Sequence, residues 1–195
     1  MDPFQALVRI IPFAFASGVN LYATIAVAGV CARYGLMELP EQFRGFGHPM
    51  VIGVAVAMYL VEFVADKVPW VDTLWDAVHT VIRPVGGALV AMAALGDTGP
   101  GTQAMAALLG GSVALTSHMA KAGTRAVANT SPEPFTNWGL SLAEDAFVIG
   151  LTWFAVEHPY AATAVALVLI ALIVATASRV VKAVRRRFAG SKVTL

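Results

Sequence analysis

The segment from Tyr160 to Val181 is the strongest constraint on what this chain folds into. Its sequence, YAATAVALVLIALIVATASRVV, carries no charge before Arg179. A helix of roughly 20 apolar residues is long enough to cross the hydrocarbon core of a bilayer. Tyr160 and Arg179 fit its two interfacial ends, because aromatic rings and long basic side chains reach the lipid headgroups. The segment therefore predicts a transmembrane helix.

The composition and the charges after this segment agree with a membrane location. Of 195 residues, 58% are hydrophobic and only 13% are charged, whereas soluble domains have roughly 45–50% and about 25%. The net charge of +1 predicts no nucleic-acid partner. Basic residues after the apolar run predict a cytoplasmic C-terminus by the positive-inside rule. They are Arg179, Lys182, Arg185, Arg186, Arg187 and Lys192.

Five further apolar segments are predicted as helices, so we expect an all-α membrane protein of about six spanning or partly spanning helices. The first, residues 7–35, is interrupted by Pro12, Gly18 and Asn20. The others cover residues 49–69, 71–95, 103–123 and 138–159, and Pro- and Gly-rich connections separate them.

An internal repeat relates the two halves of the chain. Residues 18–47 align without gaps with residues 110–139, with eight identities in thirty positions, where composition alone gives roughly two or three. The identical positions are Gly18/Gly110, Thr24/Thr116, Ala28/Ala120, Arg33/Arg125, Pro40/Pro132, Glu41/Glu133, Phe43/Phe135 and Gly47/Gly139. Each copy therefore contains a Pro-Glu-x-Phe loop.

The offset of 92 residues predicts two three-helix halves, residues 1–98 and 99–188, followed by a cytoplasmic tail, residues 189–195. An odd number of spans per half reverses the orientation of the second half, which predicts a 3+3 inverted repeat. With six spans, both termini are expected in the cytoplasm. The first Pro-Glu-x-Phe loop then faces outward and the second inward.

Acidic residues interrupt the apolar segments, and they are the candidates for an ion or solute path: Glu62, Asp66, Asp72, Asp76, Glu144 and Asp145. A charge at the bilayer centre costs about 2.5–3.5 kcal/mol on insertion scales, so these groups are expected to face the protein interior, a wet cavity or the interface. A structural network near the interface is the other explanation. Glu62 follows the uncharged run from Met50 to Val61, which predicts a position well inside the second helix. Asp66 and Lys67 are then expected near the cytoplasmic mouth of the path.

Two stripes of charge are spaced for helix faces. Asp72, Asp76, His79 and Arg83 are spaced 4, 3 and 4 residues apart, and His118, Lys121 and Arg125 are spaced 3 and 4. We expect Asp72 or Asp76 to pair with Lys121 or Arg125 across the third and fourth helices. No zinc-binding, phosphate-binding or nucleophile motif is present. We therefore expect no enzymatic activity, no cofactor and no structural zinc.

Four stretches carry a family resemblance: GVNLYATIAVAGV, YLVEFVADKVPWVDTLWDAVHTVIRP, SHMAKAGTRAVANTSPEPFTNW and SLAEDAFVIGLTW. They resemble the bacterial membrane family catalogued as domain of unknown function 4126 (DUF4126), from about Phe13 to His158. The resemblance implies an integral membrane protein of a bacterial cytoplasmic membrane and implies no activity. EFVADKV also resembles the E-x-G-D motif of cation–proton exchangers, but its Glu–Asp spacing is longer and the second half lacks a copy.

The first functional hypothesis is a transporter or channel for a small solute, with a cation as first choice, because hard cations prefer carboxylate and carbonyl oxygens. Glu62 and Asp66 supply the carboxylates, and unwound backbone near Gly18, Asn20 and residues 110–112 supplies carbonyls. The alternatives are a site for an anionic lipid or phosphate headgroup at His118, Lys121 and Arg125, or a non-transporting scaffold. Expected partners are membrane lipids and a small ion or solute, and a homo-oligomer is compatible with the sequence.

Overall fold

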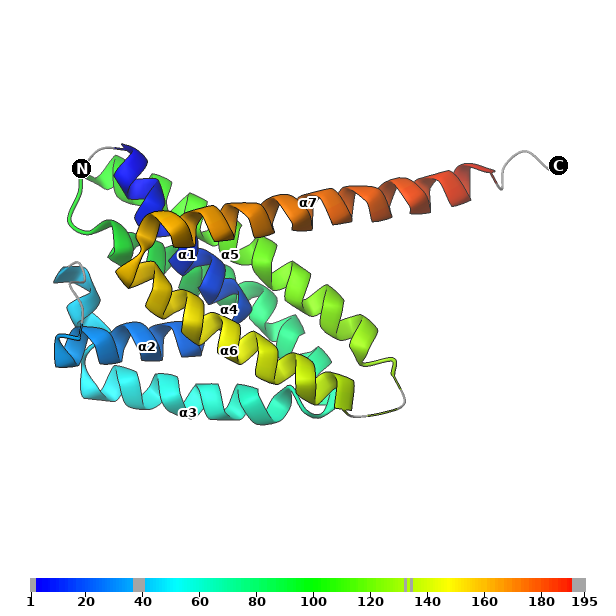
Figure 1. Ribbon diagram of the computed structural model, residues 1–195, viewed down its shortest axis with the longest axis horizontal. Helices are drawn as coiled ribbons and strands as arrows, with labels where there is room; N and C mark the ends of the chain where they lie inside the picture. Colours follow the sequence, from blue (N-terminus) through cyan, green and yellow to red (C-terminus); the bar gives the residue numbers. More distant parts are fainter. Residues whose placement is uncertain (1–2, 37–40, 132, 134, 191–195) are drawn as a thin grey trace.

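The computed structural model describes residues 3–36, 41–131, 133 and 135–190. Within these residues the chain has seven α-helices, one short 3-10 helix and no strand, as the all-α prediction requires. In chain order they are α1 (Pro3–Val19), α2 (Leu21–Tyr34), η1 (Glu41–Gly45), α3 (Pro49–Ala65), α4 (Pro69–Leu95), α5 (Pro100–Ala128), α6 (Phe135–Glu157) and α7 (Pro159–Gly190). Figure 1 shows one elongated bundle, from which the C-terminal half of α7 projects.

The segment expected as one interrupted helix over residues 7–35 is two helices, because the chain breaks completely at Asn20. Asn20 is extended, with φ −149° and ψ 102°. Its side-chain oxygen accepts a hydrogen bond of 2.9 Å from the backbone nitrogen of Ala23 and so caps α2. Pro12, by contrast, is accommodated inside α1. The described residues thus contain one more helix than the six expected.

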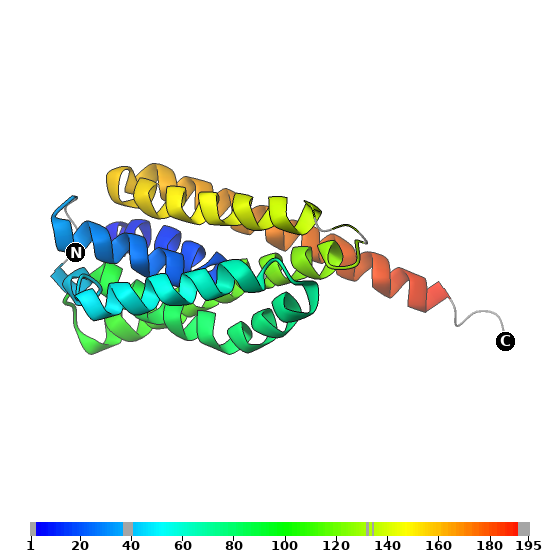
Figure 2. The same cartoon turned by 90° about the horizontal axis from the view of Figure 1, so that it is seen from below.

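The two short helices α1 and α2 enter the bundle and leave it at the same end. Near the start of α1, the Val8 carbonyl accepts a hydrogen bond of 2.8 Å from the hydroxyl of Thr163, in the first turns of α7. At the end of α1, Arg83 in the middle of α4 donates to the Gly18 carbonyl at 3.1 Å. α2 returns from there, and Gly29 near its end packs against Ile52 in the first turn of α3. Figures 1 and 2 show a V that reaches the centre of the bundle without crossing it.

The five remaining α-helices, α3 to α7, run between the two ends of the bundle in alternating directions. As a result, α1 begins at one end of the long axis and α7 ends at the other (Figures 1 and 2). The expectation of both termini on one side assumed six crossings. The break at Asn20 leaves α1 and α2 as two shorter helices at one end of the bundle, and the side of each terminus stays a prediction.

Glycines allow α1, α4 and α5 to approach one another closely. A Cβ atom on Gly87 of α4 would overlap Ala114 of α5, and one on Gly110 of α5 would overlap Ala91 of α4. A Cβ atom on Gly18 at the end of α1 would overlap Ala114 as well. Small residues at helix contacts are typical of membrane proteins, where close backbone packing drives helix association.

The outside of the bundle is apolar, as expected for a protein that faces lipid. α4, α6 and α7 are each long and apolar enough to cross a membrane, and α1, α2 and α3 are shorter apolar helices. Large aliphatic side chains are exposed on several helices, including Val54, Leu74 and Leu108. Soluble monomers rarely expose apolar patches of this extent. These observations indicate an integral membrane protein.

We expect η1 and the end of α7 to be accessible from opposite sides of the membrane, because they lie at opposite ends of the bundle. Single cysteines replacing Arg44 and Arg187 test this in a Cys31→Ser background. A membrane-impermeant maleimide should label one position in intact cells and the other only in inverted vesicles. The wild type is the control, since its Cys31 is 1% exposed and should stay unlabelled. Labelling of both positions from the same side would contradict the placement of these two ends on opposite sides of the membrane.

Candidate functional site: a buried ionic cluster

Charged side chains gather inside the bundle, where the last turn of α3 meets the first half of α4 and the second half of α5. We call them the ionic cluster: Glu62, Asp66, Asp72, Asp76, Arg83, Lys121 and Arg125. None of the seven is more than 6% exposed. Glu144 and Asp145 of α6 lie at its edge. The helical spacing of the two charged stripes brings these groups together, because α4 and α5 turn the stripes inward.

Arg83 of α4 forms the centre of the cluster and contacts α1, α3 and α5. Its Nη2 donates to Glu62 Oε1 at 2.7 Å, and its Nη1 donates to the Gly18 carbonyl at 3.1 Å. That carbonyl is available because α1 ends one residue later, and the last carbonyls of a helix lack partners within the helix. Asp76 of the same stripe lies 3.7 Å from Arg83 Nη1. The break at Asn20 thus leaves a free carbonyl that accepts from the buried Arg83, and Arg83 supplies the donor that this carbonyl lacks within its helix.

Lys121 joins α5 to the end of α3. Its Nζ donates to Glu62 Oε1 at 3.0 Å and to Asp66 Oδ2 at 3.3 Å. Glu144 Oε2 of α6 lies 3.7 Å from the same nitrogen. The ammonium group therefore has three carboxylates around it, and Glu62 Oε1 is shared between Lys121 and Arg83.

Arg125 holds α4, α5 and α6 together. Its Nε donates to both carboxylate oxygens of Asp72 at 3.2 Å, and its Nη2 donates to Asp72 Oδ1 at 3.1 Å. Its Nη1 donates to the Asn137 carbonyl of α6 at 3.0 Å, and its Nη2 also donates to the Asp66 carbonyl. Asn129 adds a hydrogen bond of 2.7 Å to Asp72 Oδ2. The predicted pairing across α4 and α5 is present as Asp72 with Arg125.

The contacts of His118 define it as a neutral side chain. Arg83 Nη1 lies 2.9 Å from His118 Nδ1, and because arginine only donates, Nδ1 accepts. The hydrogen of the ring is therefore on Nε2, which lies 3.0 Å from Thr80 Oγ1. Thr80 donates its own hydroxyl hydrogen to the Asp76 carbonyl at 3.0 Å. His118 thus brings no positive charge to the cluster.

His79 links α4 to α2 through its two ring nitrogens. Its Nδ1 lies 2.7 Å from the Trp75 carbonyl, which can only accept, so Nδ1 carries the hydrogen. Its Nε2 lies within hydrogen-bond distance, 3.0 Å, of the Tyr22 hydroxyl. The Trp75 ring stacks on the imidazole with a centroid distance of 4.5 Å. Tyr22 of α2 is thereby tied to α4.

Acidic groups outnumber basic ones in this region of the bundle. Six carboxylates, four in the cluster and two at its edge, face three cationic side chains. Asp145 Oδ1 accepts from Asn20 Nδ2 at 3.2 Å, so the residue that breaks α1 from α2 also contacts an acid of α6. Five carboxylate oxygens have no hydrogen-bond partner among the described residues: Glu62 Oε2, Asp66 Oδ1, Asp76 Oδ1, Glu144 Oε2 and Asp145 Oδ2.

The structure corrects the expected position of Glu62 in its helix. α3 ends at Ala65, so Glu62 lies in its last turn rather than near its middle, although the side chain is fully buried. Lys67 lies outside the cluster. Its Nζ donates to the Phe63 carbonyl at 2.8 Å and sits 3.0 Å from the centroid of the Phe63 ring.

The first Pro-Glu-x-Phe loop does not reach the cluster. Pro40 lies outside the described residues. Glu41 is exposed and pairs with Arg44 at 3.0 Å. Phe43 is buried and packs against Phe13 of α1 at a centroid distance of 5.1 Å.

The second loop forms the start of α6 instead. Pro132 lies outside the described residues. Glu133 accepts a hydrogen bond of 2.8 Å from the Phe135 backbone nitrogen, which caps the helix. Hydrogen bonds from Thr136, its hydroxyl above all, hold the pKa of Glu133 below its usual range. Phe135 is exposed, unlike Phe43, so the two loops differ in their packing.

Several site residues were not among the sequence candidates. The sequence indicates Arg83 only as the end of the α4 stripe and gives no sign of its central position. Asn129 lies four residues after Arg125, so it continues the spacing of the α5 stripe. The side chains of Asn20 and Asn137 gave no signal, because single asparagines are common at helix ends. The part of the chain that the structure describes contains no group of three or more His, Cys, Asp or Glu side chains placed to hold a metal ion.

The fold and the cluster define a helical membrane protein with an ion-paired polar interior. The profile of the family described as domain of unknown function (DUF4126) matches residues 7–179, and the chain belongs to this family. The match confirms the resemblance carried by the sequence motifs. No curated protein and no solved structure matches the chain.

We expect removal of Arg125 alone to destabilise the protein by about 3–5 kcal/mol, because Asp72 is left buried and uncompensated. The variant Arg125→Gln should show this in denaturant unfolding in detergent micelles. The double variant Arg125→Gln/Asp72→Asn should be milder. Arg44→Gln is the matched control, since the exposed Arg44–Glu41 pair contributes about 0–1 kcal/mol. Equal losses for Arg125→Gln and Arg44→Gln would show that the cluster does not hold the helices together.

Proposed function

We propose that this protein is a membrane transporter or channel for a small cation, with the ionic cluster as part of the path. The excess of carboxylates over cationic groups in the bundle carries the proposal. Three more carboxylates than cations lie in a region surrounded by apolar surface. Uncompensated negative charge is strongly unfavourable there, so a bound cation or protons must balance it.

The arrangement around Asn20 supports the same proposal. Helices that end inside a membrane bundle place backbone carbonyls and a helix N-terminus at the level of a binding site in many transporters. Here the end of α1 and the start of α2 meet Arg83 and Asp145 at the centre of the bundle. Unpaired oxygens of Asp145 and Glu62 lie in this part of the protein. The chain is proposed to act without a cofactor and without a catalytic step.

The alternative of an anionic headgroup site is less well supported. His118, Lys121 and Arg125 are all buried, and all three use their nitrogens on protein acceptors or donors. A headgroup would have to displace those contacts and enter a region that is already rich in carboxylates. A scaffold held together by a structural charge network stays the competing proposal, and it predicts no flux.

The helix boundaries support the proposed inverted repeat. With the offset of 92 residues, the end of α3 at Ala65 corresponds to the end of α6 at Glu157. α4 then corresponds to α7, and α2 to the second half of α5. In Figure 1, the two helices of each pair run in opposite directions. We therefore keep residues 98 and 188 as the proposed ends of the two halves. α1 has no inverted counterpart in the second half.

The proposed location is a bacterial cytoplasmic membrane, with the basic end of α7 in the cytoplasm. The positive-inside rule supports this side, because four arginines and a lysine lie between residues 179 and 187. With this orientation we propose that the start of α1 and η1 face the outer side, because they lie at the end of the bundle opposite to the end of α7. The turn after α3 then faces the cytoplasm. This proposal keeps the outward position of the first Pro-Glu-x-Phe loop and the cytoplasmic C-terminus, and it changes only the side of the N-terminus.

The experiment is cation flux into proteoliposomes, followed for H⁺, Na⁺, K⁺ and Mn²⁺ separately. Asp145→Asn removes one surplus charge and keeps an oxygen to accept from Asn20. We expect flux to fall at least about tenfold, the factor that corresponds to a barrier change of about 1.4 kcal/mol. Glu41→Gln, an exposed acid far from the cluster, should transport like the wild type. A wild type that passes none of these ions would favour the scaffold, and unchanged flux in Asp145→Asn would place the path elsewhere.

A further inference from the structure

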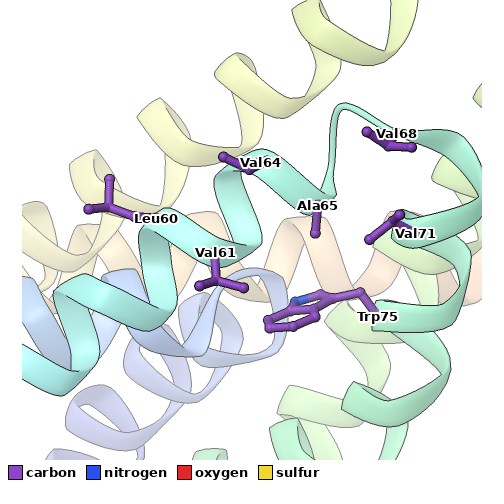
Figure 3. Close-up of a pocket in the computed structure, with 7 residues that line it drawn as sticks. All are labelled: Leu60, Val61, Val64, Ala65, Val68, Val71 and Trp75. Carbon is purple, nitrogen blue, oxygen red and sulfur yellow. The ribbon is translucent and has the colours of Figure 1, made fainter.

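The polar atoms that lack partners point to a binding site inside the bundle rather than on its surface. A surface groove of about 460 Å³ lies between the end of α3 and the start of α4, and aliphatic side chains and Trp75 line it (Figure 3). None of the residues that line it is charged, so the groove selects no polar ligand. The buried oxygens without partners are concentrated on α6 instead.

Asp145 of α6 differs from the other five carboxylates of this region because it has no cationic partner. Each of the others forms at least one ion pair: Glu62, Asp66, Asp72, Asp76 and Glu144. None of the ion pairs formed by the described residues includes Asp145. Asp145 is 5% exposed, its Oδ1 accepts only from the neutral amide of Asn20, and its Oδ2 has no hydrogen-bond partner in the part of the chain that the structure describes. A carboxylate enclosed in this way lacks the opposite charge that its burial requires.

Ser141 lies one turn before Asp145 on the same inner face of α6, and its hydroxyl is also without a partner. Residues four apart on a helix share a face, with Cβ atoms about 5–6 Å apart. Ser141 is fully buried, and its Oγ forms no hydrogen bond with the described residues. Other buried hydroxyls on helices donate to the carbonyl four residues earlier, namely those of Ser17, Thr24, Ser117 and Thr163. Because Ser141 makes no such bond, its oxygen is free to bind a ligand together with Asp145.

The chemistry of α6 selects a cation with a single charge. α6 carries no Lys, Arg or His between Phe135 and Glu157. Its buried side-chain atoms without partners among the described residues are all oxygens: Asn137 Oδ1, Ser141 Oγ, Glu144 Oε2, Asp145 Oδ2 and Thr152 Oγ1. Carboxylate and other oxygen ligands suit hard cations, and the number of charged ligands sets how strongly a divalent ion is held. One unpaired carboxylate with neutral neighbours balances one positive charge, and the described residues place no three His, Cys, Asp or Glu side chains together for a metal ion.

We propose that Ser141 and Asp145, on the inner face of α6, bind a monovalent metal cation, Na⁺ or K⁺. Asp145 Oδ2 supplies the negative charge, Ser141 Oγ supplies a neutral ligand, and water completes the coordination. The cation takes the place of the ion pair that Asp145 lacks, next to the residue that separates α1 from α2. This inference rests on the proposed function, because it assumes that a cation balances the surplus carboxylates, and it names the ion that balances one of them.

The test compares melting temperatures of the purified protein in detergent micelles, in choline chloride, NaCl, KCl or MnCl₂ of equal ionic strength. A cation that binds only the folded state raises the melting temperature. We expect the wild type to melt at a higher temperature in NaCl or KCl than in choline chloride, and Ser141→Ala and Asp145→Asn to lose this difference. In choline chloride, Ser141→Ala should melt no lower than the wild type, because the hydroxyl that it removes has no partner to lose.

Thr152→Val is the matched control. Thr152 is fully buried on the same face of α6, and its hydroxyl also lacks a partner among the described residues. It lies seven residues from Asp145, which is about 10 Å along the helix axis, too far to share an ion. Thr152→Val should therefore keep the difference between NaCl or KCl and choline chloride.

Each other result has a definite meaning. If the wild type melts at the same temperature in choline chloride, NaCl and KCl, the site is overturned, and the proposed function then rests on H⁺. A rise in MnCl₂ alone would overturn the assignment to a monovalent cation. An equal loss in Thr152→Val would show a general effect of α6 packing and refute a localised site. A wild type that melts higher in NaCl or KCl but passes no cation into proteoliposomes would support this site and refute transport.

Discussion

The guanidinium group of Arg83 is the interaction on which the rest of the structure depends. It is completely buried, and it binds the Glu62 carboxylate of α3, the Gly18 carbonyl at the end of α1 and the imidazole of His118 on α5. A buried arginine that lost these partners would carry an uncompensated charge inside a membrane protein, at a cost of several kcal/mol. Four helices are therefore fixed relative to one another by a single side chain. Lys121 and Arg125 extend the same network to Asp66, Asp72 and α6.

This network explains why a helix break is tolerated at the centre of the bundle. Ending α1 at Val19 leaves backbone carbonyls without partners in the helix, and unsatisfied polar groups are very unfavourable in lipid. Arg83 binds the Gly18 carbonyl, and the Ser117 hydroxyl donates to the Phe15 carbonyl at 2.9 Å. Asn20 satisfies the start of α2 and contacts Asp145. Broken backbone and buried charge thus stabilise each other, as in the discontinuous helices of transporters.

Much of this arrangement was predictable from local spacing. The stripe from Asp72 to Arg83 and the stripe from His118 to Arg125 follow the helical period, so the Asp72–Arg125 pair could be expected. The position of the helix break could not be chosen from the sequence, since Pro12 and Asn20 are both plausible interruptions and only tertiary contacts decide between them. The capping side chain of Asn20 and the Arg83–Gly18 contact, 65 residues apart, resolve that choice. The same residue decides that α1 and α2 are two helices rather than one, which local spacing could not predict.

The central claim is that the surplus carboxylates of the bundle are balanced by protons or by a bound cation. Infrared spectroscopy of the protein in lipid bilayers at neutral pH tests it directly, because protonated and ionised carboxyl groups absorb at different frequencies. In buffer stripped of metal cations, the wild type should show absorption from protonated carboxyl groups that is reduced in Asp145→Asn or Glu144→Gln. The same absorption should fall when a cation that binds the cluster, among Na⁺, K⁺ and Mn²⁺, is added. A wild-type spectrum that contains only ionised carboxylates, with and without added cations, would contradict the account.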